Sequence, residues 1–321
     1  MNAVVLKDGD YAYEVVEGWG RLPDGWRFED VAAVAIDAED RVYVFNRGEH
    51  PMIVFDRAGN FLRSWGEGVF NHPHGLDIGR DGAIYCTDDG DHTVRKFDLD
   101  GRLLLEIGIP GRPSPRMSSR PFCRCTHTAL SPRGDIYVSD GYGNACIHKF
   151  SPDGKLLKTW GELGSRPGQF FLPHNLVCDS EGWVYVADRE NHRIQVFDGE
   201  GNYETQWNNL VRPCAVCMGR EATPLFYVGE AGPAPTVGFP GLGPRLSIFD
   251  GQGELVARVG DIDAGIGPGR FIAPHGIATD SAGDICIGEV SYSAWPAVFP
   301  GEPRPEMIPT LHRLRKLNKT G

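Results

Sequence analysis

The sequence of 321 residues lacks long apolar runs, and no segment has the roughly 20 consecutive apolar residues of a transmembrane helix. It also lacks positive charge: 32 Lys and Arg stand against 43 Asp and Glu, and the formal net charge is −11. Nucleic acids and anionic membranes bind basic surfaces, so neither is an expected partner. The start, MNAVVLKDGDYAYE, has no basic and then apolar layout typical of a secretory signal, and a cytoplasmic location is expected.

Cysteine is also scarce, with eight residues dispersed along the chain. Disulfide frameworks are typical of short secreted chains, so free thiols are expected here. Cys123 and Cys125 form a CxC pair without a matching second pair, which does not fit a zinc ribbon.

Glycine and proline, in contrast, are abundant. The 42 glycines and 24 prolines occur in a chain that is 41% hydrophobic, which is too apolar for a disordered protein. This combination predicts many short strands joined by tight turns. Segments 75–108, 128–161 and 175–207 align with one another, and each contains four alternating apolar runs separated by Asp/Gly turns. Four such runs predict a four-stranded antiparallel sheet.

The repeat predicts the fold. Self-similarity at about 40 to 55 residues, with four strands per unit, indicates a β-propeller. Further copies begin near Val34, Cys214 and His275, which makes six blades. The segment YAYEVVEGWGRLP resembles a fourth strand and LHRLRKLN a third, so the N-terminal strand should complete the last blade and leave no open edge. We therefore predict an all-β chain in which residues 1–321 form one domain, a six-bladed β-propeller.

A proline-histidine pair occurs in FNHPHGL (70–76), FFLPHNL (170–176) and RFIAPHGI (270–277). Each histidine lies eleven residues before an equivalent second-strand position: His74 before Tyr85, His174 before Tyr185, and His275 before Cys286. The three histidines therefore belong to blades two, four and six. Alternate blades of a propeller surround its central channel, so we expect the three imidazoles to converge at one channel mouth.

The equivalent positions in blades one, three and five are Ala32, Thr126 and Cys214. Three imidazoles with one open position are typical of a catalytic zinc site, so the pattern predicts a Zn²⁺ cofactor. The alternative interpretation is that the pair is a turn preference of the repeat and that each histidine caps a loop.

Other polar residues follow second strands. Arg47 in VFNRGEH and Arg189 in VADRENHR could hold a substrate carboxylate, or could instead pair with neighbours such as Glu49 or Glu190. Tyr142 in SDGYGNAC could act as an acid or base near a cation, or could pack over the channel mouth. Lesser candidates are His72, His127 and His192.

The set FNRGEH, LPHNL, SDGYGN, RPGQF and VYVADRENHRIQVF resembles the peptidyl-α-hydroxyglycine α-amidating lyases, also called peptidylamidoglycolate lyases, which are six-bladed NHL-repeat propellers with a zinc held by three histidines. The resemblance extends from about Val34 to Glu289, is most specific in 131–197, and suggests a bacterial-type cytoplasmic member. The resemblance implies that His74, His174 and His275 bind zinc, that Arg47 and Arg189 hold the substrate, and that Tyr142 is the catalytic phenol. Apart from the resemblance, His127 is a further substrate-binding candidate.

The family's reaction splits a carbinolamide into an amide and glyoxylate without redox chemistry. The resemblance therefore implies a zinc-dependent carbon–nitrogen lyase, and in a cytoplasmic chain a small carbinolamide or carbinolamine is a more plausible substrate than a peptide hormone precursor. Two alternatives stay open: a metal-dependent propeller hydrolase resembling lactonases or amidases, and an NHL interaction scaffold without activity.

The sequence departs from the family at its cysteines. Animal members have two disulfides in these blocks, but Gly143, Tyr185 and Val196 stand at three of the half-cystine positions and only Cys123 is retained. This departure fits a reducing compartment.

A second departure concerns calcium. The family's structural Ca²⁺ uses backbone carbonyls at positions matching Val34 and Leu76, and an aspartate at the position of Gly276. An anionic oxygen ligand is thus missing from the calcium site that the resemblance implies. Ala273 replaces a methionine of the family, so the pocket is expected to differ.

Overall fold

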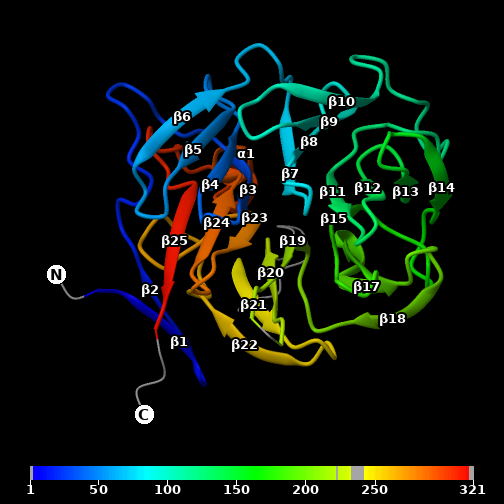
Figure 1. Ribbon diagram of the computed structural model, residues 1–321. Coiled ribbons are helices and arrows are strands. Elements are labelled where there is room, and N and C mark those ends of the chain that lie inside the picture. The colour runs from blue at the N-terminus through cyan, green and yellow to red at the C-terminus, as the bar shows by residue number, and fades with distance from the viewer. Residues whose placement is uncertain (1–2, 222, 233–241, 318–321) are drawn as a thin grey trace. The chain divides into compact units, whose positions relative to one another are not determined.

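The computed structural model describes residues 3–221, 223–232 and 242–317. In these ranges the chain forms six antiparallel sheets, with one α-helix and one 3-10 turn (Figure 1). The fold class is a six-bladed β-propeller, which confirms the prediction from the repeat. None of the described helical segments has the length and apolar character needed to cross a bilayer.

Contacts along the chain define two compact units. Unit 1 comprises residues 1–64 and 217–321, and unit 2 comprises residues 65–216. Unit 2 contains the second, third and fourth sheets, while unit 1 contains the sixth sheet and most of the first and fifth.

The sheets of unit 2 each consist of four consecutive strands. The second sheet contains β7 (Pro73–Ile78), β8 (Ile84–Asp88), β9 (Thr93–Phe97) and β10 (Leu103–Gly108). The third contains β11 (His127–Leu130), β12 (Ile136–Asp140), β13 (Cys146–Phe150) and β14 (Leu156–Trp160). The fourth contains β15 (Pro173–Cys178), β16 (Val184–Asp188), β17 (Arg193–Phe197) and β18 (Tyr203–Trp207), with the 3-10 turn η1 at Arg189–Asn191.

The first and fifth sheets have the same order. The first contains β3 (Val31–Ile36), β4 (Val42–Asn46), β5 (Met52–Phe55) and β6 (Phe61–Trp65). The fifth contains β19 (Pro213–Met218), β20 (Phe226–Glu230), β21 (Arg245–Phe249) and β22 (Leu255–Val259).

The sixth sheet joins the two ends of the chain. Its order is β1-β2-β25-β24-β23, with β1 (Val5–Asp8), β2 (Tyr11–Val15), β23 (Pro274–Thr279), β24 (Ile285–Glu289) and β25 (Leu311–Lys316). Tyr13 of β2 pairs with Lys316 of β25, and Figure 1 shows these blue and red strands side by side. The predicted closure by the N-terminal strand is confirmed. Strand β1 adds a fifth strand that the repeat did not predict.

The Asp/Gly turns of the repeat adopt the expected tight geometry. In the turn between β9 and β10, the Gly101 N–H donates to the Asp98 carbonyl (3.1 Å). Gly101 has a φ of 90°, which only glycine adopts without strain. The Asp98 side chain accepts the Arg102 N–H (2.8 Å). Aspartate and glycine thus have separate roles in the turn, which explains why the pair recurs.

An acidic side chain at the end of the second strand anchors the loop before the first strand of the same blade. Asp88 accepts the N–H of Asn71 (2.6 Å), and Asp188 accepts the N–H of Phe171 (2.7 Å). Glu289 accepts two N–H groups of the loop before β23 (2.7 and 2.8 Å). All three acids are buried. These loops lead directly into the proline-histidine pairs, so the acids hold the segments that place the histidines.

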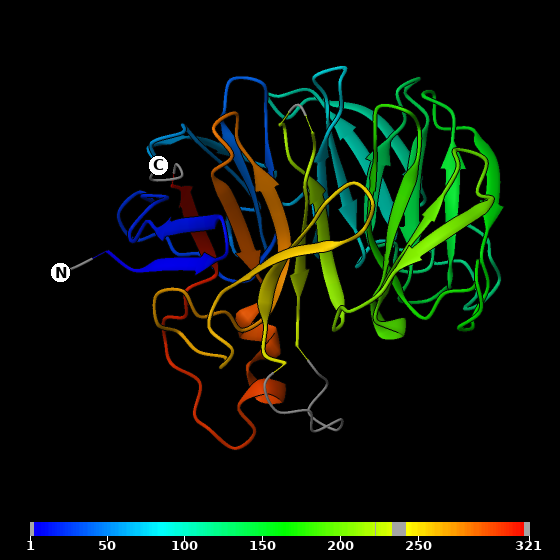
Figure 2. The ribbon, with the colours of Figure 1, turned by 90° about the horizontal axis from the view of Figure 1, so that it is seen from below.

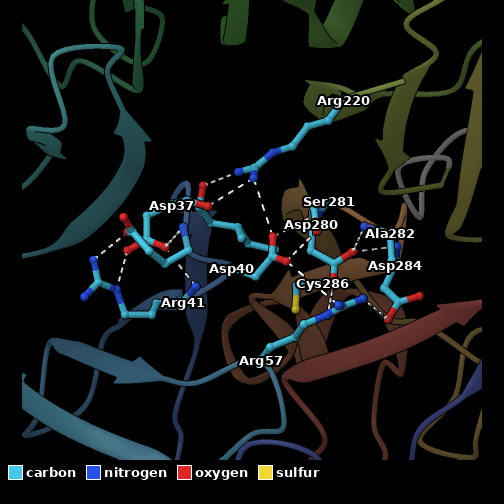
Figure 3. A network of polar contacts seen from close by, with 12 residues as sticks. Asp37, Asp40, Arg41, Arg57, Arg220, Asp280, Ser281, Ala282, Asp284 and Cys286 are labelled. Carbon is cyan, nitrogen blue, oxygen red and sulfur yellow. Dashed lines mark hydrogen bonds and ion pairs between the residues drawn. The ribbon is translucent and has the colours of Figure 1, made fainter. Parts of the chain in front are cut away.

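A polar network in unit 1 joins the turns of several strands (Figure 3). Arg220, after β19, donates to the carbonyl of Asp37 after β3 (3.0 Å). Arg57, after β5, donates to the carboxylate of Asp280 after β23 (3.0 Å). The network lies at the end of β23 that is opposite to its histidine, so it stabilises the fold without contributing to the predicted site.

The helix α1 (Ser291–Val298) was not predicted from the sequence. It follows β24 and, with the chain leading to β25, extends beyond the sheet (Figure 2). Trp295 of α1 packs in one cluster with Ile272 and Ala273, just before the third proline-histidine pair. The helix therefore supports the segment that holds His275.

Candidate functional site

The three predicted histidines occupy equivalent positions in three different blades. His74, His174 and His275 are each the second residue of a first strand, β7, β15 and β23. In β7 the pairing register shifts between Pro73 and Gly75, and the same shift flanks the other two histidines. A β-bulge of this kind takes the residue out of the strand ladder and redirects its side chain.

Each histidine binds the next blade through its Nδ1 atom. The Nδ1 atoms lie within hydrogen-bond distance of backbone carbonyls: His74 with Thr126 (2.6 Å), His174 with Cys214 (2.7 Å) and His275 with Ala32 (2.6 Å). A carbonyl oxygen only accepts, so Nδ1 carries the hydrogen and Nε2 carries the lone pair. Metal-binding histidines are commonly oriented in this way. The three acceptors are the residues that the sequence register identified as equivalents in the intervening blades.

A glycine allows this close approach. A Cβ atom added at Gly75 would lie 2.6 Å from the carbonyl oxygen of Thr126, which is too close for any other residue. The residue after His174 is Asn175, whose side chain accepts the Val216 N–H (3.4 Å). The residue after each histidine thus helps to dock one first strand on the next.

The Tyr142 phenol lies between two of the histidines in unit 2. Its oxygen is 3.0 Å from Nε2 of His74 and 3.1 Å from Nε2 of His174. The two imidazole rings meet edge to face with centroids 4.9 Å apart. One phenol hydrogen can be donated to only one of the two nitrogens at a time.

Two guanidinium groups flank the Tyr142 ring. The Arg124 Cζ is 4.7 Å from the ring centroid and the Arg189 Cζ is 5.7 Å from it. Cations over an aromatic face are attracted by the ring. They also favour negative charge that develops on the phenol oxygen.

Arg124 was not identified from the sequence. It donates from Nε to Asp89 (3.0 Å), and its Nη2 also contacts the same carboxylate. Although burial alone would raise the pKa of Asp89, His72 and Arg124 hold it below its usual value. The ionised Asp89 thereby fixes Arg124 beside the phenol. Arg124 precedes its strand within a long connection, where no motif marks it.

Arg189 lies beside the Tyr142 ring and also forms an ion pair with Glu190. It pairs with Glu190 (2.8 Å), and Arg212 holds the same carboxylate from the other side (3.0 Å). Burial would lower the pKa of Arg189, but Cys214, Tyr142 and Glu190 raise it overall, so the guanidinium stays charged. Arg189 is thus a fixed cation beside the phenol, and its Glu190 contact does not remove it from the site.

Arg47 and His275 belong to unit 1. The Arg47 N–H donates to the carbonyl of Asp30 (2.8 Å), and its guanidinium lies 3.7 Å from the carboxylate of the same residue. Asp30 is therefore a partner of Arg47 that the sequence did not suggest. Both Arg47 and His275 are largely buried.

The lesser histidine candidates have different surroundings. The His127 ring packs against Gly75, and burial lowers the pKa of His127 to about 4, so it is neutral at physiological pH. Its Nδ1 is buried and has no hydrogen-bond partner within the described ranges. His72 contacts the Asp89 carboxylate, and His192 accepts the Arg212 N–H (3.2 Å). The last two therefore support the loops that carry the arginines.

The calcium site that the resemblance implies lacks its aspartate in this chain. Val34 lies in β3 and Leu76 in β7. A Cβ atom added at Gly276 would lie 2.6 Å from the Cα of Ala33, so the backbone leaves no room for the missing aspartate.

Four positions match half-cystines of the family, and in the structure they lie as two neighbouring pairs: Tyr185 with Val196, and Cys123 with Gly143. Tyr185 and Val196 are cross-strand partners in β16 and β17. A Cβ atom added at Gly143 would lie 2.2 Å from the Sγ of Cys123. All eight cysteines are free thiols.

We expect Gly143→Cys to form a disulfide with Cys123 on oxidation, because the two side chains would meet. Closing a loop of this length should stabilise the fold by about 3 kcal/mol, seen as a rise in melting temperature that reductant reverses. The double variant Gly143→Cys/Cys123→Ser is the control and should show no such rise. Nine titratable thiols in the oxidised single variant would contradict the prediction.

Sequence comparison gives the class of the protein. Residues 122–150 and 172–197 match the NHL repeat. Peptidyl-glycine alpha-amidating monooxygenase A of Xenopus laevis is 31% identical over 300 residues, covering 82% of this chain and 31% of that protein. NHL repeat-containing protein 3 of Homo sapiens is 34% identical over 219 residues, covering 64% and 63%. Peptidyl-alpha-hydroxyglycine alpha-amidating lyase 1 of Drosophila melanogaster is 35% identical over 164 residues, covering 47% and 30%. The chain is a propeller with NHL repeats at residues 122–150 and 172–197, and it is similar to proteins named as amidating enzymes. It spans less than two thirds of the length of these relatives.

Solved structures share the fold at low identity. A streptogramin B lyase has a TM-score of 0.57 and 13% identity, over 96% of this chain and 87% of that chain. A gluconolactonase from Xanthomonas campestris has a TM-score of 0.60 and 12% identity, over 99% and 96%. At these identities the likeness shows the propeller fold alone.

Proposed function

We propose that the chain is a metal-dependent carbon–nitrogen lyase that splits an α-hydroxyglycine-type carbinolamide or carbinolamine into an amide or amine and glyoxylate. The observation that carries the proposal is the Tyr142 phenol oxygen between the Nε2 atoms of His74 and His174, with Arg189 beside the ring. The name of the Drosophila melanogaster relative, an amidating lyase, supports the same reaction class.

We infer that His74, His174 and His275 would hold the metal, with Zn²⁺ as the expected ion. The support is chemical: each imidazole has its hydrogen fixed on Nδ1 by a carbonyl, so each offers the Nε2 lone pair that a metal requires. The shared bulge position on alternate blades supports one common site. When bound, a zinc ion would supply a Lewis acid that polarises an oxygen of the substrate.

The chain's own residues account for binding and proton transfer. A substrate carboxylate would be held by Arg189, with Arg47 as the second guanidinium implied by the family resemblance. Tyr142, as the phenolate, would take the proton of the α-hydroxyl group while the carbon–oxygen double bond forms and the carbon–nitrogen bond breaks. The bonding electron pair leaves on the nitrogen, which then takes a proton from the Tyr142 phenol. The products are an oxo acid and an amide or amine, with no change of oxidation state overall.

Neutral His127 suits a position beside this site. A histidine that stays uncharged at physiological pH does not repel a cationic metal or the arginines, and it could contact a polar group of the substrate. We therefore keep His127 as a substrate-binding candidate, next to the His74 strand.

The test is to incubate zinc-loaded protein with acyl, aryl and ureido derivatives of α-hydroxyglycine and to assay glyoxylate. We expect release from at least one derivative, loss of release on chelation, and recovery when zinc is restored. A folded, zinc-loaded protein that releases no oxo acid from any derivative would contradict the lyase proposal. Activity of such a protein on lactones or amides would assign it to the hydrolases instead.

A further inference from the structure

A second cluster of potential metal ligands lies inside the third blade, between β12 and β13 (Figure 1). It consists of Asp140, Cys146 and His148, all fully buried. The His148 Nε2 atom is 3.2 Å from an oxygen of Asp140 and 3.6 Å from the Sγ of Cys146. Three different donor atoms therefore surround one small volume of the blade interior.

The fourth blade has a guanidinium at the equivalent place. Strand pairing sets Asp140 opposite Cys146 in the third blade and Asp188 opposite Arg193 in the fourth. Arg193 donates to Asp188 (2.9 Å), and Gln195, two residues further along, donates to the same oxygen (3.1 Å). The buried acid of the fourth blade is thus neutralised by a guanidinium.

In the third blade, Cys146 stands where the fourth blade has its arginine, and His148 stands where it has its glutamine. The acid keeps its structural role, because Asp140 accepts the Cys123 N–H with both oxygens (3.1 and 3.0 Å). It also accepts from Asn144 (2.8 Å). Neither of these donors carries a positive charge, and an isolated buried carboxylate is costly. A cation in the cluster would therefore stabilise the Asp140 carboxylate, as the guanidinium stabilises that of Asp188.

The geometry suits a metal ion better than a proton. One hydrogen on Nε2 of His148 cannot point at both the carboxylate and the sulfur. In tetrahedral coordination, zinc bonds of about 2.0 to 2.3 Å place neighbouring donor atoms about 3.3 to 3.6 Å apart, close to the two distances observed. The Nδ1 of His148 lies 2.8 Å from the Thr159 hydroxyl, which fixes the ring with Nε2 toward the cluster.

We propose that Asp140, Cys146 and His148 bind a Zn²⁺ ion as a structural site in the third blade, through a carboxylate oxygen, Sγ and Nε2, with a water in the fourth position. A carboxylate, a thiolate and a neutral imidazole balance the two charges of the ion. Binding displaces the Cys146 proton to solvent, so no oxidant or reductant is involved.

Because the cluster is closed to solvent, the ion would be taken up during folding. Its role would be to fix the loop that follows β12 and carries Tyr142. This inference is independent of the lyase proposal, since the cluster contains none of the residues assigned to that reaction.

The experiment is to measure zinc and cobalt binding in wild-type protein and in Cys146→Ala, each also in a His174→Ala background. Cys178→Ala, which removes a thiol outside the cluster, is the matched control. We expect Cys146→Ala to bind one zinc ion per chain fewer than the matching protein with Cys146, in both backgrounds. If the histidine site also binds zinc, the wild-type chain holds two ions and the double variant none. Cobalt-loaded His174→Ala should show a thiolate-to-metal charge-transfer band that Cys146→Ala lacks and that Cys178→Ala retains.

Equal zinc content in wild-type and Cys146→Ala protein, with no charge-transfer band in cobalt-loaded His174→Ala, would overturn the proposal and leave a hydrogen-bonded acid–histidine–thiol cluster. If Cys146→Ala does not fold, X-ray absorption of zinc-loaded His174→Ala decides the question. A sulfur scatterer at about 2.3 Å from zinc supports the site, and a shell of nitrogen and oxygen only overturns it.

Discussion

Replacing Tyr142 with phenylalanine is expected to lower kcat for glyoxylate release by about 10²- to 10⁴-fold, the range that a positioned acid or base contributes. The reason is that the lost oxygen is the one placed 3.0 Å and 3.1 Å from the Nε2 atoms of His74 and His174. The ring and its contacts with Arg124 and Arg189 remain, so KM should change far less than kcat. Steady-state kinetics with the best α-hydroxyglycine derivative measures both constants.

Tyr185→Phe is the matched control for this variant. It removes a hydroxyl that donates to Asp179 (3.0 Å), outside the site, so it should cost about 1 kcal/mol of stability and leave kcat unchanged. A Tyr142→Phe protein that keeps the wild-type kcat would show that the phenol transfers no proton in the reaction. The acid–base role would then pass to another group.

His174→Ala is expected to lose one zinc ion per chain and to reduce glyoxylate release to the background rate. Residues that merely orient a metal ligand already change affinity by about 10- to 100-fold, so loss of a ligand should weaken binding by at least about 100-fold. Zinc content after dialysis against a chelator and the rate of glyoxylate release measure the two effects. The circular dichroism spectrum should stay that of a folded propeller.

The control for the metal prediction is His192→Ala, which removes an imidazole that accepts the Arg212 N–H in a loop. This variant should keep its zinc. Wild-type zinc content together with full activity in His174→Ala would contradict the assignment of the histidines to the metal. Loss of zinc with activity retained would instead separate the metal from the chemistry.

The fold could be predicted because the signal repeats. Alternating apolar runs, Asp/Gly turns and a second strand of the IYV type recur in successive blades, and each turn residue has a local reason to be there, as Asp98 and Gly101 show. Strand β1 and helix α1 occur outside the repeat. They depend on contacts with distant segments, such as that of Trp295 with Ile272, which a local pattern does not reveal.

Only those residues of the candidate site that occupy equivalent positions in the repeat could be predicted from the sequence. The register marked His74, His174 and His275 as equivalents, and their acceptors follow from the same alignment. Arg124 was missed because Asp89, a residue of another blade, holds it at the phenol. That contact depends on tertiary structure. No spacing within the connection before β11 encodes it.

The cluster of Asp140, Cys146 and His148 is also visible in the sequence, as a difference between two aligned repeats. Aligning ACIHKF with HRIQVF sets a cysteine against an arginine behind a shared buried aspartate. A repeat protein provides its own reference for such comparisons. A residue that breaks the charge balance of its equivalents can thus be detected within one chain.

The bulge that carries each histidine has a consequence for how such a site can change over time. A residue outside the strand ladder can be exchanged without breaking sheet hydrogen bonds, and Ala32 occupies the same kind of bulge in β3. The chain already contains four residue types at this one position, since alanine, threonine and cysteine alternate with histidine. Each blade therefore holds one exchangeable side chain at the equivalent position, so new combinations of ligands can arise by single substitutions while the scaffold is inherited intact.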